Sequence, residues 1–118
     1  MALSRFASQF AAEIKNHDWS DSPWRLDRAG HDRNMDRAKS RTLEPDEAEN
    51  VKVNAMWVTA QVLAYSDPNF SVEEFAVACG LSRRITHRSD GKFSKGLVNG
   101  LRTSGEKLAI PGTSDFDD

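Results

Sequence analysis

The sequence predicts a small all-α domain of four or five helices. Apolar residues recur at spacings of three and four in several segments, and start and stop signals for helices flank those segments. The length of 118 residues suits one compact domain. The dipeptide Asp90-Gly91 is typical of a hairpin turn and leaves room for one short β-hairpin near residues 83–94. We therefore expect a single helical domain over residues 1–112 and an acidic tail over 113–118.

The first helix is expected over residues 3–14. Its apolar residues share one stripe, which we expect to pack on the core: Leu3, Phe6, Ala7, Phe10 and Ile14. A docking helix for a partner protein is the alternative. Residues 16–41 are polar and are expected to be loosely ordered, with Trp19 and Trp24 attaching them to the core.

The clearest helix is expected to begin at Pro45 and to run to Tyr65. Proline suits the first turn, and the acidic residues that follow complement the helix dipole. A near-heptad stripe follows, formed by Val51, Ala55, Val58, Val62 and Tyr65. We expect this helix to be central, buried on more than one side, and packed on residues 3–14 and 72–79. A dimer seam is the alternative role for the stripe.

A short helix is expected over residues 72–79 because its start, packing and end are all signalled. Ser71 and Glu74 have the spacing of a capping box, and Phe70 and Phe75 that of a hydrophobic staple. Gly80 then suits the left-handed conformation that ends a helix.

Two interpretations remain open for the chain after Ser82. Ile85 and Phe93 could be inward residues on the arms of a hairpin, or residues 83–88 could form a second short helix followed by a loop at Asp90-Gly91. A helical face over residues 93–101 and an extended segment over 108–111 complete the expected elements.

Residues 71–88 resemble a helix-turn-helix module in part. Ala76 and Gly80 stand four apart, as in that motif, and Leu81 and Ser82 would plug the core and cap the second helix. The motif usually has an aliphatic residue six positions after the glycine, where this chain has Thr86 and carries its aliphatic residue one position earlier.

The resemblance implies that the second helix presents cations to double-stranded DNA, and the helix around residues 95–102 is an alternative recognition element. The expected DNA-binding residues are Arg83, Arg84, His87, Arg88, Lys92, Lys95 and Arg102.

Charge is segregated along the chain although the net charge is only -2. Residues 42–74 hold one lysine and seven acids, a net of -6, whereas residues 75–102 hold six cations and one acid, a net of +5. A basic segment between acidic ones can form a local positive face on an acidic protein. The module over residues 71–102 is thus the basic part of the domain.

The sequence predicts no catalytic residue, no metal site and no cofactor. Cys79 is the one cysteine, and its small neighbours indicate a buried thiol. The pairs His17-Asp18 and His31-Asp32 resemble part of the ligand set of HD-type metal-dependent phosphohydrolases, but the central helix supplies no further ligand. Nucleotide-binding and hydrolase motifs are also missing from the sequence.

These observations predict a small cytoplasmic DNA-binding protein, a transcriptional regulator that forms a homodimer and uses residues 83–102. No apolar run is long enough to span a membrane, and the N-terminal residues read as an amphipathic helix rather than a signal peptide. The alternative function is a protein–protein interaction module, a small adaptor or inhibitor with no affinity for DNA.

Overall fold

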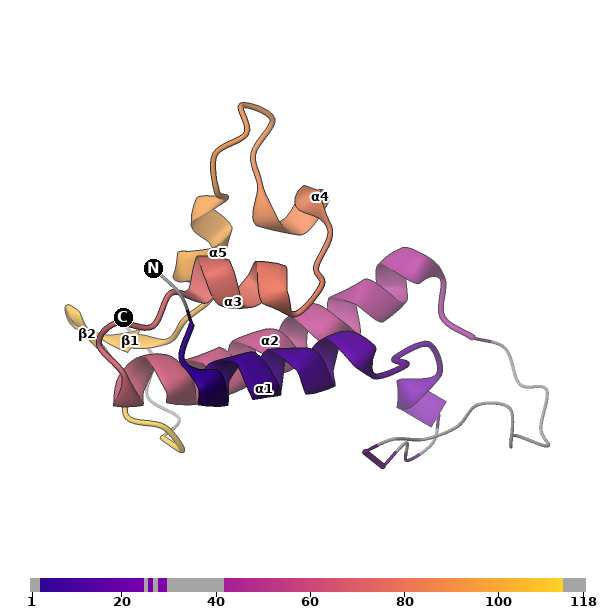
Figure 1. Cartoon of the computed structure of the whole chain (residues 1–118), viewed down its shortest axis with the longest axis horizontal. Helices are drawn as coiled ribbons and strands as arrows, with labels where there is room; N and C mark the ends of the chain where they lie inside the picture. Colours follow the sequence, from indigo (N-terminus) through magenta and orange to yellow (C-terminus); the bar gives the residue numbers. More distant parts are fainter. Residues whose placement is uncertain (1–2, 25, 27, 30–41, 114–118) are drawn as a thin grey trace.

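A computed structural model describes residues 3–24, 26, 28–29 and 42–113. Within these residues the chain forms five α-helices, one 3-10 turn and one short two-stranded sheet, which confirms the predicted class (Figure 1). The elements are α1 (Arg5–Asn16), η1 (Ser22–Trp24), α2 (Pro45–Ser66), α3 (Val72–Ala78), α4 (Arg83–Thr86), α5 (Lys95–Asn99), β1 (Thr103–Ser104) and β2 (Lys107–Leu108). Most of residues 25–41 and the acidic tail beyond 113 lie outside the described residues, and so do His31 and Asp32.

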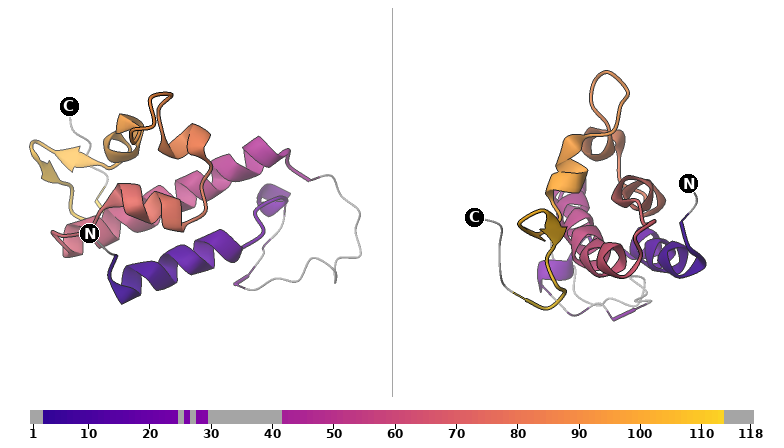
Figure 2. Two further views of the ribbon diagram at one scale, coloured as in Figure 1. Left: turned by 45° about the horizontal axis from the view of Figure 1, so that its top comes forward. Right: turned by 90° about the vertical axis from the view of Figure 1, so that its left-hand side faces the viewer.

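The core lies where α1, α2 and α3 meet. Helix α1 runs beside the long α2, and the short α3 packs against both, as the sequence predicts (Figures 1 and 2). The largest fully buried side chains are Phe75, Met56, Leu97, Thr86 and Cys79. None of the described helices is both long enough and apolar enough to cross a membrane.

The buried face of α1 differs from the predicted stripe. Ala7, Ala11 and Ile14 are buried, whereas Phe6 and Phe10 are exposed and meet edge to face with ring centroids 4.8 Å apart. The two alanines are small enough to let the helix backbones approach closely, so the bulky rings lie outside the contact. The prediction that both phenylalanines pack on the core is therefore wrong.

The buried face of α2 also differs from the predicted one. Val53, Met56, Ala60 and Leu63 face α1 and α3, while residues of the near-heptad stripe, Val58 among them, remain exposed. The helix carries two apolar stripes, and periodicity alone does not tell which one the neighbouring helices cover.

Gln61 attaches the C-terminal hairpin to α2. Its Nε2 donates to the carbonyls of Arg102 and Ala109, and its Oε1 accepts the Arg102 amide at 2.7 Å. Strands β1 and β2 pair antiparallel with Thr103 opposite Leu108. The sheet thus lies after α5, and the expected extended tail is in part its second strand.

The residue after α5 lies so close to Trp57 of α2 that glycine is required there. Trp57 Nε1 donates to the Leu97 carbonyl at 3.0 Å, and a Cβ at Gly100 would collide with the Trp57 indole. Gly100→Ala should therefore lower the free energy of unfolding by about 1–3 kcal/mol, since the indole cannot move without losing its hydrogen bond. Gly96→Ala, one turn earlier, is the matched control.

That control should stay within about 1 kcal/mol of wild type, because the Ser94 hydroxyl oxygen, 3.3 Å from an added Cβ at Gly96, can shift slightly to relieve the contact, and alanine favours the helix. Urea unfolding of both variants measures the difference. Equal effects of the two substitutions would contradict the contact between Gly100 and Trp57.

Candidate nucleic-acid interface

Helix α3 begins after the predicted cap at Ser71, packs through the predicted pair Phe70 and Phe75, and ends before Gly80. The Ser71 hydroxyl accepts the Glu74 amide at 3.2 Å, and the rings of Phe70 and Phe75 stand 5.3 Å apart. Gly80 has a φ of +81°, which an L side chain rarely adopts. The chain therefore turns sharply after α3 and enters α4.

Helix α4 is a single turn whose buried residue is Thr86, 1% exposed. Thr86 is six positions after Gly80, which is the buried position of the helix-turn-helix motif, and Ile85 is only half-buried. The Thr86 hydroxyl donates to the Ser82 carbonyl at 3.3 Å and lies 2.7 Å from Nδ1 of His87. A polar residue can occupy this position because its hydroxyl finds local partners.

Glu49 of α2 fixes the start of α4. Its carboxylate accepts the Ser82 amide at 2.7 Å, the Ser82 hydroxyl at 2.8 Å and the Arg84 guanidinium at 3.0 Å. Arg84 also donates to the Asp46 carbonyl at 3.3 Å. The prediction that the Ser82 side chain caps α4 is wrong, because this hydroxyl is bonded to Glu49 instead.

Glu49 should make stability depend on acid pH. Partial burial raises the pKa of the Glu49 carboxyl. The hydrogen bonds from Ser82 and the charge of Arg84 together lower it by more than burial raises it, so the pKa lies below its ordinary value of 4.5. A carboxyl whose pKa is lowered by folding stabilises the folded state at pH values above its ordinary pKa. This contribution is lost as the pH falls through the folded-state pKa.

Glu49→Gln should therefore be less stable than wild type at neutral pH, and the gap should close in acid. Urea unfolding at several pH values measures this gap. A gap that stays constant down to acid pH would show that the ionised carboxylate does not hold α4.

A hairpin-shaped loop connects α4 to α5 and projects from the helical body (Figure 1). His87 and Phe93 form an antiparallel bridge at its base, with their rings stacked at 4.7 Å. Arg88 and Asp90 pair at 2.7 Å near the tip, where Gly91 has a φ of +87°. Both interpretations of this segment hold in part, since a one-turn helix precedes a hairpin turn, but Phe93 is exposed and does not point inward.

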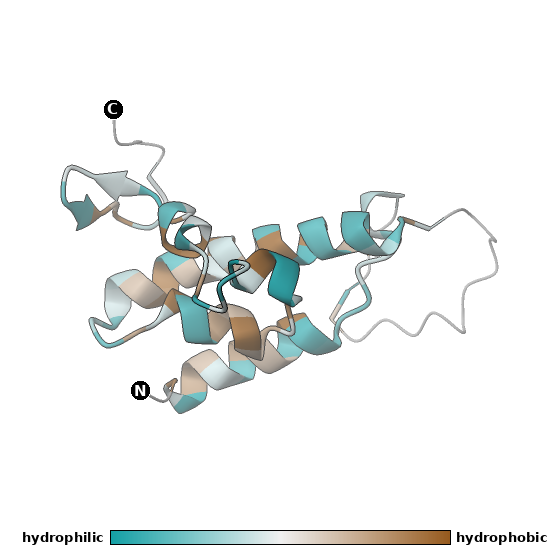
Figure 3. Cartoon of the chain, turned by 90° about the horizontal axis from the view of Figure 1, so that it is seen from above, coloured by the Kyte–Doolittle hydropathy of each residue, from teal (hydrophilic) through white to brown (hydrophobic). Residues whose placement is uncertain are grey.

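The seven predicted DNA-binding residues fall into three groups. Arg83, Lys92 and Lys95 are exposed and form no ion pair within the part of the chain that the structure describes. Two more are exposed but ion-paired, Arg84 with Glu49 and Arg88 with Asp90. In Figure 3 the ribbon of α4 and of the loop after it is coloured mostly as hydrophilic.

The remaining two have structural contacts. His87 is half-buried against Phe93. Arg102 is half-buried and donates to the Ile110 carbonyl at 3.2 Å, while its backbone is bonded to Gln61. Helix α5 ends at Asn99, so the alternative recognition helix over residues 95–102 is not formed as one element.

The pair His17-Asp18 and the Cys79 thiol, which the sequence also offers as reactive groups, have contacts or surroundings of their own in the structure. The rings of His17 and Trp19 are in contact at a tilt of 56°, and Asp18 accepts hydrogen bonds from the Ser20 amide and hydroxyl. Among the described residues no three histidine, cysteine or acidic side chains come together in a way that could hold a metal. Burial raises the pKa of the Cys79 thiol to about 12, so it stays protonated at neutral pH.

Comparisons of the chain with protein-family models, with curated proteins and with solved structures gave no match. The functional argument therefore rests on the residues of this chain.

Proposed function

We propose that the protein binds double-stranded DNA through residues 83–95, chiefly by contacts to phosphates. The observation that carries the proposal is a set of exposed cations that form no ion pair with any described residue, Arg83, Lys92 and Lys95, on the segment that runs from α4 through the projecting loop to the start of α5. Residues 83–95 hold five cations and one acid, a net charge of +4. Cations of this kind gain affinity for DNA by releasing the counterions that surround its phosphates.

The segment is held in place before any ligand arrives. Glu49 binds the start of α4, and the bridge between His87 and Phe93 closes the base of the loop. Binding therefore requires little ordering of the backbone, which would otherwise reduce the affinity. Arg84 and Arg102 support this architecture through Glu49 and the Ile110 carbonyl.

The short α4 favours phosphate contact over reading of bases. A recognition helix lies in the major groove and is long enough to contact several base edges. Helix α4 has only four residues. Phosphate contacts fix the position of a protein on DNA and carry little sequence information. We therefore expect weak sequence preference from one copy of the chain, and a transcriptional regulator built this way would need a second copy for a defined site.

A binding titration against a short labelled duplex tests the proposal. At a salt concentration of about 50 mM the protein should bind a duplex of arbitrary sequence, and the affinity should fall steeply as salt rises. Failure to bind any duplex at low salt would reject the proposal and favour the protein–protein interaction module.

A further inference from the structure

One face of α2 is apolar and exposed. Val58, Val62 and Tyr65 are 72%, 51% and 48% exposed, and Val51 and Ala55 beside them are half-buried. The opposite face of α2 already packs on α1 and α3. One copy of the chain therefore folds without covering this apolar face of α2.

The residues of this face have the spacing of a two-helix seam. Their intervals are four, three, four and three, which is the heptad pattern of the a and d positions in a coiled coil. Scattered exposed apolar residues need no explanation, but a heptad run on one straight helix is self-complementary. At 1.5 Å per residue the run from Val51 to Tyr65 is about 21 Å long.

We propose that a second copy of this chain docks on the seam, with its α2 antiparallel to the first. We define the seam as Val51, Ala55, Val58, Val62 and Tyr65. The association does not require DNA, so this inference stands or falls separately from the proposed function.

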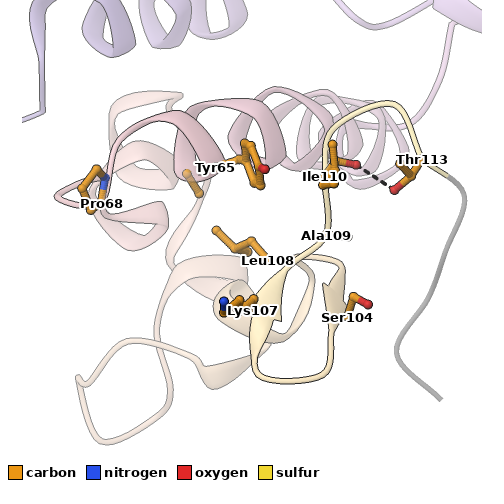
Figure 4. A pocket seen from close by; sticks show the side chains of 9 residues that line it. Tyr65, Pro68, Ser104, Lys107, Leu108, Ala109, Ile110 and Thr113 are labelled. Atoms are coloured by element: carbon orange, nitrogen blue, oxygen red, sulfur yellow. Dashed lines mark hydrogen bonds between the residues drawn. The ribbon is translucent and has the colours of Figure 1, made fainter.

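Charged side chains at both ends of α2 can pair with a second copy. Glu44 and Glu47 lie at the N-terminal end of α2, on the side of the seam by heptad spacing. Lys107 lies at the other end, in the hollow that Tyr65 and Pro68 line (Figure 4). An antiparallel pair brings Glu44 and Glu47 of each copy to Lys107 of the other, where Glu106 also lies, whereas in a parallel pair Glu47 would meet Lys52, which flanks the seam directly after Val51.

The sizes of the side chains favour the antiparallel direction. An antiparallel pair places Tyr65 of one copy toward the smaller Val51 and Ala55 of the other, while a parallel pair would set tyrosine against tyrosine and alanine against alanine. The flanking Asn54 and Thr59 carry no charge, so the middle of the seam has no like-charge repulsion.

Sedimentation of the full chain without DNA tests the dimer. The wild type should rise from 13.2 kDa toward twice that mass as concentration increases through the micromolar range. Val58→Glu should remain at the monomer mass, and its thermal midpoint should equal that of wild type at concentrations low enough for both to be monomers, since its side chain is exposed. The control is Val77→Glu on α3, 48% exposed and off the seam, which should dimerise like wild type.

A wild type that stays monomeric over this range, or a Val58→Glu variant that dimerises as well as wild type, would overturn the proposal. A charge swap tests the direction. Lys107→Glu should weaken the dimer, and adding Glu47→Lys should restore it. If Lys107→Glu leaves the dimer unchanged and Lys52→Glu weakens it, the helices are parallel and the antiparallel assignment is wrong.

Discussion

Replacing Phe75 with alanine should lower the free energy of unfolding by about 3–5 kcal/mol, because it removes the largest fully buried side chain. Phe75 lies in the core between α1, α2 and α3 and contacts Phe70. A domain of this size has a total stability of about 5–15 kcal/mol, so the variant should lose a large part of it. Urea unfolding followed by circular dichroism measures the change.

Phe6→Ala is the matched control, since it makes the same substitution on α1 at a side chain that is 63% exposed. Its effect should be within about 1 kcal/mol of wild type, because exposed positions contribute little burial. A loss at Phe6 as large as that at Phe75 would contradict the arrangement of α1, in which alanines rather than phenylalanines face the core.

The second large effect is expected on DNA binding. Replacing Arg83, Lys92 and Lys95 together with alanine should weaken binding to a duplex at low salt by about 100-fold, because three phosphate contacts are lost at once. Thermal unfolding of the variant should match wild type, since all three side chains are exposed and form no ion pair with any described residue.

A variant with the same change in charge on α1 controls for the net charge of the protein. Arg5→Glu combined with Gln9→Glu also makes the protein three units more negative, at two exposed positions in the first half of α1. This control should keep most of the affinity. Equal losses in the two variants would show that only the total charge matters.

The ends of the helices were predictable because local chemistry sets them. Ser71 caps α3 and Gly80 ends it, and each acts on backbone atoms only a few residues away. A short stretch of sequence is therefore enough to predict both ends of the helix. The same holds for α2, whose first turn contains Pro45 and acidic residues. The order of the helices and the contacts among the first three follow from these boundaries.

The contacts between distant segments were not predictable in the same way. Glu49 binds Ser82 from 33 residues away, and no local pattern marks that pairing. The choice of which face of α2 is buried depends on the alanines of α1, which permit a close approach that apolar periodicity does not reveal. The burial of Thr86 was not predictable either, because its hydroxyl is bonded to the Ser82 carbonyl, a partner that only the folded turn provides.

The dimer proposal and the DNA proposal would reinforce each other. A two-fold pair joined through α2 carries two copies of residues 83–95, so the number of phosphate contacts doubles without any new contact within one copy. Val58→Glu should then weaken duplex binding as well as dimerisation, whereas the variant without the three cations should still dimerise.

The salt dependence of duplex binding tests the central claim most directly. The slope of log K against log salt reports how many phosphates the protein neutralises, at about 0.9 per contact. If Arg83, Lys92 and Lys95 each contact one phosphate, replacing all three should make the slope shallower by about 2.7 per copy of the chain. An unchanged slope in that variant, with the control on α1 behaving identically, would contradict binding through residues 83–95.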